Sequence, residues 1–127
     1  LKPVPEKDII VSDVRDLDPA EGEMLRDSDI TIVESMKALQ AVPLPDKPIY
    51  LHFDTDVVNT DEMPAMSYPA DGGPSLSDTV AAVRRIVREG EIAGVLFTLW
   101  NNGLPGADKA QHSTMQVLRA VLEELHR

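Results

Sequence analysis

The sequence contains no cysteine. Without a thiol, the chain cannot build a disulfide scaffold, a thiolate zinc site or a cysteine nucleophile. It also has no apolar run approaching the roughly 20 residues that a membrane helix needs, and no signal peptide is visible. These absences fit a reducing compartment, so we expect a cytoplasmic protein that does not bind membranes.

Basic residues are in short supply. Lys and Arg number 12 against 22 Asp and Glu, which gives a formal net charge of −10. Contacts with phosphates or anionic lipids need a basic face, so we expect neither a nucleic-acid partner nor an anionic membrane surface. The acidic balance fits a cationic ligand, a metal ion or simply a soluble surface.

The chain shows no internal repeat and no low-complexity tract. Its 127 residues are 43% hydrophobic, enough to bury a core as one domain. Apolar, β-branched runs predict strands, and they alternate with segments of helical periodicity. The alternation predicts an α/β fold, with a mainly parallel sheet between two helical layers. The expected strands are residues 8–14, 30–33, 49–54 and 92–100.

Helical patterns fill the spaces between these strands. Asp18 is the expected cap of a first helix ending near residue 27, with Met24 and Leu25 facing inward. A short helix is expected at 34–39, and a longer one follows a cap at Ser75 or Ser77. In a last helix we expect one buried apolar face and one solvent face. The expected buried face is Leu118, Val121, Leu122 and Leu125, and the expected solvent face is Arg119, Glu123 and Glu124.

Two aspartates, Asp54 and Asp56, close the third predicted strand. Residues i and i+2 of an extended chain point the same way, and ligands gather at the carboxyl ends of parallel strands. Unpaired carboxylates repel each other, and a divalent cation with its preference for hard oxygens removes that conflict. His52 lies on the same face and could add a nitrogen ligand or support one. The alternatives are a solvated strand end and a core histidine.

The wider sequence resembles the arginase and agmatinase family of ureohydrolases. The segment from His52 to Asn59 is similar to the family's aspartate signature, and the spacings from Asp54 to Pro64, Pro69 and Gly73 match without a gap. Upstream, residues 14–19 (VRDLDP) look like the family's R-D-x-D-P segment. The resemblance runs from about residue 8 to residue 125.

This resemblance implies an arginase/deacetylase-like α/β domain and a binuclear Mn²⁺ site. Asp54 and Asp56 match the second aspartate pair of that site. In the family, a hydroxide that bridges the two metals attacks a guanidinium carbon, and the products are urea and an amine. The resemblance also implies an ordered loop at residues 64–73 and a homo-oligomer, a trimer or a hexamer.

The family's first metal-binding region, a histidine followed by a D-x-H-x-D segment, has no match. The three histidines, His52, His112 and His126, lie in no such segment. The chain also begins with Leu1 rather than methionine. We therefore expect residues 1–127 to be the C-terminal portion of a single, incomplete arginase-like domain, catalytically inactive in isolation.

Two further departures concern the substrate pocket. By alignment through Gly94, Leu99 takes the place of the carboxylate that receives the guanidinium, and Asn101 matches the family's asparagine. A leucine cannot pair with that cation, whose burial without a partner costs several kcal/mol. Asn59 and Thr60 replace the usual Asp-Pro, and Trp100 either lines the pocket or packs in the core.

Three hypotheses follow for the function. The first is a metal-dependent hydrolase that cleaves a C–N bond of a guanidino, amidino or ureido small molecule. The second is a non-catalytic homologue that acts as a binding or structural subunit. The third is an unrelated α/β domain with a lone Mg²⁺ or Ca²⁺ site. The sequence does not identify the substrate.

Overall fold

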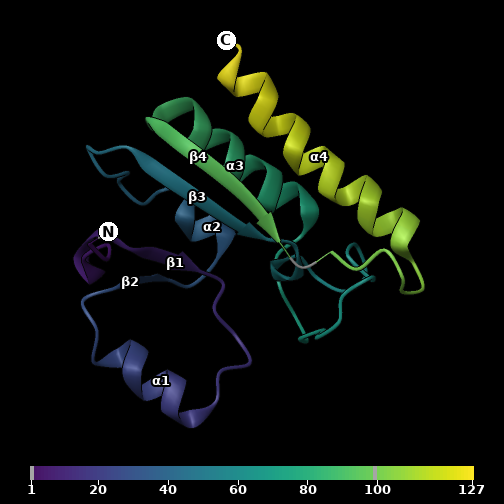
Figure 1. Ribbon diagram of the computed structural model, residues 1–127, viewed down its shortest axis with the longest axis horizontal. Coiled ribbons are helices and arrows are strands. Elements are labelled where there is room, and N and C mark those ends of the chain that lie inside the picture. The colour runs from purple at the N-terminus through teal and green to yellow at the C-terminus, as the bar shows by residue number, and fades with distance from the viewer. Residues whose placement is uncertain (1, 99) are drawn as a thin grey trace.

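The computed structural model describes residues 2–98 and 100–127. Strands and helices alternate as the sequence predicts (Figure 1). In chain order the elements are η1 (Glu6–Asp8), β1 (Ile10–Ser12), α1 (Pro19–Arg26), β2 (Thr31–Val33), α2 (Met36–Leu39), β3 (Ile49–Asp54), η2 (Thr55–Val57), α3 (Leu76–Glu89), β4 (Ile92–Thr98) and α4 (Ala107–Leu125).

Both strand pairings are parallel, which confirms the predicted α/β class. β1 pairs with β2, and β3 pairs with β4. Over residues 2–98 and 100–127 these are two separate two-stranded sheets, and no ladder joins β1 to β3. Side chains link the pairs instead: Lys47 Nζ donates to Asp8 Oδ1 over 2.6 Å, and Arg15 donates to the carbonyl of Asp56. The carboxyl ends of the strands point to the same side of the molecule (Figure 1).

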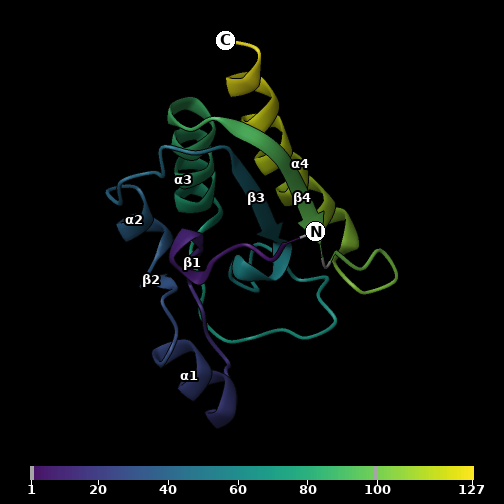
Figure 2. The same cartoon turned by 60° about the vertical axis from the view of Figure 1, so that its left-hand side comes forward.

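The main core lies between the β3–β4 pair and two helices. Phe53 and Phe97 pack against each other across the strands, with ring centroids 5.2 Å apart and ring planes tilted by 60°. Helices α3 and α4 cover this face of the pair (Figure 2). A second cluster joins Val33 of β2 and Met36 of α2 to Ile86 of α3. Because α3 contributes to both clusters, one helical layer supports both strand pairs.

The opposite face of β3 and β4 carries no comparable cover from the described residues. Tyr50 is 64% exposed, Leu96 is 40% exposed and His52 is also exposed. Of the three expected layers, the described part of the chain therefore forms the sheet and the helical layer on one face.

The structure confirms the predicted cap of the first helix, but the predicted inward packing of this helix is wrong. Asp18 accepts from the backbone of Glu21, whose side chain accepts in return from the backbone of Asp18. Met24, expected to face inward, is 74% exposed, and none of the residues of α1 is buried. The cap forms the helix locally, but α1 lies below the β1–β2 pair and apart from the layer of α3 and α4 (Figure 1).

The buried face of α4 is rotated from the predicted one. Val117, Ala120 and Val121 are buried, whereas Leu122 and Leu125 are about half exposed. Glu124, expected in solvent, is 7% exposed. Apolar residues occur on two sides of this helix, so periodicity alone did not identify the side that meets α3. Arg84 of α3 and Arg127 each approach the buried Glu124 carboxylate at 3.2 Å.

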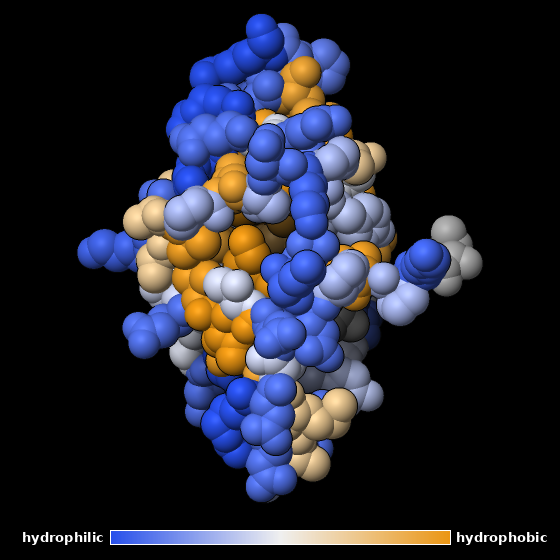
Figure 3. Space-filling model, turned by 90° about the vertical axis from the view of Figure 1, so that its left-hand side faces the viewer, coloured by the Kyte–Doolittle hydropathy of each residue, from blue (hydrophilic) through white to orange (hydrophobic). Residues whose placement is uncertain are grey.

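The surface combines apolar and hydrophilic regions. Viewed from the side where β1, β2 and the start of β3 lie, an apolar area is bordered by hydrophilic side chains (Figure 3). Across the described residues, the helices are too short or too polar to cross a membrane.

Candidate functional site

The two aspartates meet where β3 ends. Asp54 is the last residue of the strand, and Asp56 lies in the single turn of η2. The extended i, i+2 geometry expected from the sequence is therefore wrong, because the chain turns after Asp54. The turn nevertheless leaves the two carboxylates as interacting neighbours.

The electrostatics of this pair are unfavourable when both groups are ionised. Burial raises the pKa of Asp56 above its ordinary value of 3.8, and the neighbouring Asp54 carboxylate raises it further. The Arg15 guanidinium opposes this shift. Asp54 Oδ1 is buried and finds no hydrogen-bond partner among the described residues. A buried acceptor with no donor, beside a second carboxylate, is an arrangement that a cation stabilises.

The residues present fit part of a metal site. Carboxylate oxygens are the ligands that Mn²⁺ and Mg²⁺ prefer. However, residues 2–98 and 100–127 contain no cluster of three or more His, Cys, Asp or Glu side chains placed to hold a metal ion. Asp54 and Asp56 can therefore supply two ligands, and a complete coordination shell needs others.

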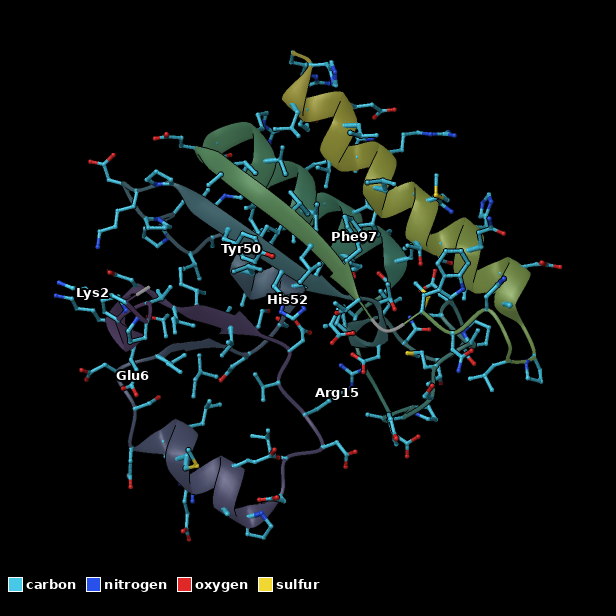
Figure 4. All side chains as sticks on the ribbon, viewed as in Figure 1. Lys2, Glu6, Arg15, Tyr50, His52 and Phe97 are labelled. Atoms are coloured by element: carbon cyan, nitrogen blue, oxygen red, sulfur yellow. The ribbon has the colours of Figure 1, made fainter. Side chains whose placement is uncertain are left out.

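Arg15 fixes the turn that carries Asp56. Its Nη2 donates to the carbonyl of Asp56 over 2.5 Å, and it enters the site from the segment after β1 (Figure 4). Arg15 follows the first predicted strand, at the sheet edge where ligands gather, and it belongs to the R-D-x-D-P segment. Both signals point to the residue, and neither predicted this contact.

The loop between η2 and α3 packs against the turn. Gly73 has φ +92°, and a Cβ there would lie 2.6 Å from the carbonyl oxygen of Val57 and 3.1 Å from Arg15 Nη2. Only glycine combines this conformation with so close an approach. Ser75, one of the two predicted caps, accepts from the backbone of Asp78 and begins α3.

Asn59 organises this loop instead of facing the carboxylates. Its Nδ2 donates to Glu62 Oε2 over 2.7 Å and to the carbonyl of Pro74 over 3.0 Å, and its Oδ1 accepts from the backbone of Glu62 over 3.0 Å. Glu62 Oε2 also accepts from the backbone of Leu76 over 2.8 Å, which ties the loop to the start of α3. The sequence analysis did not identify Glu62.

The other predicted pocket residues lie around the ends of β3 and β4. His52 Nε2 is 3.0 Å from Thr98 Oγ1 on the exposed face (Figure 4), so it is not a core histidine. Asn101 donates from Nδ2 to Ser67 over 3.0 Å and accepts from the backbone of Gly103 over 2.9 Å. Trp100 packs against the main core. The predicted substitution at Leu99 lies outside the described residues.

A cavity of about 320 Å³ lies next to the site, at the carboxyl ends of β1 and β2. Arg15 and Gly73, which both border the turn of Asp56, also line this cavity. Its remaining charged lining is mixed in sign: Asp13, Glu34, Lys37 and Asp78.

Comparison with known proteins gives the context of this site. The family model described as "Arginase family" matches residues 2–125. Among solved structures, arginase from Bacillus subtilis is 18% identical with a TM-score of 0.80, over 92% of this chain and 45% of that one. Formimidoylglutamase from the same organism is 17% identical with a TM-score of 0.82, over 95% of this chain and 42% of that protein. Proclavaminate amidino hydrolase from Streptomyces clavuligerus is 17% identical with a TM-score of 0.74, over 91% of this chain and 42% of that protein.

These structures confirm the predicted arginase-type fold, although the chain spans less than half of their length. A search of curated proteins found no match. The family model spans nearly the whole chain, from residue 2 to residue 125. The chain therefore belongs to the Arginase family.

Proposed function

We propose that the protein to which this chain belongs hydrolyses a C–N bond of a guanidino, amidino or ureido small molecule at a binuclear manganese site. The observation that carries the proposal is the Asp54–Asp56 pair, with its buried and unpartnered Oδ1, at the carboxyl end of β3. In a chain of the Arginase family, such a pair is best explained as a set of metal ligands.

Each residue of the site has a definite part in this proposal. Asp54 and Asp56 would hold the metal ions, and Arg15 fixes the orientation of Asp56 through its backbone carbonyl. A bound divalent ion supplies Lewis-acid polarisation and lowers the pKa of water, which makes a nucleophile available at neutral pH. The acidic surface, with a net charge of −10, favours the approach of a cationic substrate.

Catalysis requires ligands beyond this pair. We propose that the complete protein supplies them from polypeptide outside residues 1–127, and that it assembles as a homo-oligomer. The second candidate is a non-catalytic homologue that binds without turnover. Two observations favour it: no third ligand accompanies the pair within the described ranges, and Asn59 is engaged in its own loop.

The test uses protein made from the complete coding sequence and loaded with Mn²⁺. Metal content is measured by mass spectrometry, and hydrolysis is assayed against a panel of guanidines, amidines and ureido compounds. We expect Asp54→Asn to lose both metal and turnover, while Asp61→Asn, an exposed neighbour in the same loop, keeps both. An Asp54→Asn protein with unchanged metal content would exclude the metal site. Metal binding without hydrolysis of any compound in the panel would favour the non-catalytic candidate.

A further inference from the structure

Asn59 and Glu62 form a hydrogen-bonded pair at the start of the loop that follows η2. Asn59 Nδ2 donates to Glu62 Oε2 over 2.7 Å, and Asn59 Oδ1 accepts from the backbone of Glu62 over 3.0 Å. The same Oε2 accepts from the backbone of Leu76, the first residue of α3, over 2.8 Å. A carboxylate is favourable there because the N-terminus of a helix carries partial positive charge. One oxygen of Glu62 therefore holds both the loop and the helix.

The negative charge of this pair lies on Glu62, and the position where the resemblance places an aspartate carries none. The resemblance places Asp-Pro at residues 59–60, where this chain has Asn and Thr. An aspartate at position 59 would bring a second carboxylate to Glu62 Oε2, and it would lose the donor that bonds the carbonyl of Pro74. Carboxylates this close repel each other. Asn59 and Glu62 therefore match each other, with the charge moved three residues along the chain.

Contacts through the loop connect this pair to the candidate metal ligands. The backbone nitrogen and Nδ2 of Asn59 both donate to the carbonyl of Pro74 over 3.0 Å. The preceding Gly73 lies between Asn59 and Arg15, since a Cβ there would be 3.1 Å from the backbone nitrogen of Asn59 and 3.1 Å from Arg15 Nη2. That same Arg15 nitrogen donates to the carbonyl of Asp56. The contacts therefore run without interruption from Asn59 to the turn that carries Asp56.

We propose that Glu62 is a positioning residue for Asp56. Its carboxylate holds Asn59, which fixes residues 73–74, and this segment lies against Arg15. Arg15 in turn sets the backbone of the turn that presents Asp56. Residues that support a metal ligand orient it, and their loss typically weakens metal binding by about 10- to 100-fold. The inference rests on the proposed function, because it requires that Asp56 binds a metal ion.

The first test measures Mn²⁺ affinity in protein made from the complete coding sequence. Titration calorimetry is carried out at a temperature where circular dichroism shows that every variant is folded. We expect Glu62→Ala to weaken Mn²⁺ binding about tenfold. Glu62→Gln keeps an acceptor oxygen for both donors, so its affinity should stay within about twofold of the unchanged protein. Glu91→Ala, at an exposed glutamate, is the matched control and should bind Mn²⁺ as the unchanged protein does.

A double-mutant cycle tests the placement of the charge without metal. Urea midpoints of the metal-free protein are compared for Asn59→Asp, Glu62→Gln and the double variant. We expect Glu62→Gln to lower the midpoint of the unchanged protein, because charge-assisted hydrogen bonds are lost. In the Asn59→Asp protein the same change should raise the midpoint, because it removes one of two facing carboxylates. A shift of the same sign in both proteins would overturn the matching of the pair.

The affinities also separate this inference from the proposed function. Loss of Mn²⁺ in Asp54→Asn, with unchanged affinity in Glu62→Ala, overturns the inference and leaves the proposed function standing. Unchanged affinity in both variants overturns both. Equal weakening in Glu62→Ala and the Glu91→Ala control also overturns the inference, because the effect is then not specific to the contacts of Glu62.

Discussion

At the scale of single residues, the Asp54–Asp56 pair makes stability depend on pH. The pKa of Asp56 is raised in the folded chain, so the unfolded chain ionises at lower pH than the folded one. Without metal, the folded state is therefore progressively disfavoured as the pH rises from below 3.8 through the raised folded value. Burial is the main cause of this shift, and the charge of Asp54 is the second.

Removing the Asp54 charge tests this coupling. In metal-free buffer, we expect Asp54→Asn to raise the free energy of unfolding at pH 7 by about 0.5 kcal/mol, the scale of a close like-charge contact. At pH 3 the difference should shrink, because Asp56, whose pKa is raised, is then protonated and no longer carries a charge that the Asp54 substitution could relieve. Urea titrations at the two pH values measure this, with Asp61→Asn as the control. An equal effect at both pH values would show that charge is not responsible.

Glu124 is a second carboxylate whose contribution to the free energy of unfolding depends on its burial and its ion pairs. Its side chain is 1% exposed and is approached by Arg84 and Arg127, whereas the neighbouring Glu123 is 47% exposed. We expect Glu124→Ala to lower the free energy of unfolding by about 2 kcal/mol, because it removes a buried carboxylate that both Arg84 and Arg127 contact. Glu123→Ala should cost less than about 1 kcal/mol, as for an exposed ion pair. Equal losses in urea titrations would contradict this assignment.

At the scale of elements, two adjacent glycines of the η2–α3 loop have different constraints. Both have positive φ, but a Cβ on Gly73 would meet the backbone of Val57 at 2.6 Å, whereas one on Gly72 would meet nothing within 4 Å. We expect Gly72→Ala to cost about 1 kcal/mol from its conformation, and Gly73→Ala to cost about 2–3 kcal/mol because the clash is added. Thermal unfolding monitored by circular dichroism compares them. Similar midpoints would mean that the loop moves to accept the added methyl.

The helices show what could be predicted from the sequence. Capping is local chemistry, so Asp18 was correctly predicted as a helix start, and the cap of α3 is Ser75, one of the two predicted serines. Which side of a helix is buried depends on the elements packed against it. The exposure of Met24 and the burial of Glu124 were therefore not predicted from the sequence. The Asp54–Asp56 pair was found because both residues follow one strand. The support from Arg15 crosses 41 positions in sequence, and no local pattern encodes it.

At the scale of the whole molecule, the strands within residues 2–98 and 100–127 divide into two pairs that side chains bridge. Lys47 with Asp8 and Arg15 with Asp56 connect the pairs near their two ends. Apolar contacts with α3 also join the two strand pairs. The site thus lies where the two pairs meet, and Arg15 joins the β1 side to the turn after β3.

This division has a consequence for self-association. In the described part of the chain, β1 and β3 each have one edge without a partner strand, and such an edge is a template for adding strands from other molecules. The net charge of −10 opposes that contact at low salt, and screening weakens the opposition. We expect the 127-residue polypeptide to sediment as a monomer in dilute buffer and to form β-rich aggregates in about 1 M NaCl. A polypeptide that stays monomeric at high salt would show that these edges are protected. If the complete protein pairs these edges, it should resist salt at the same concentration.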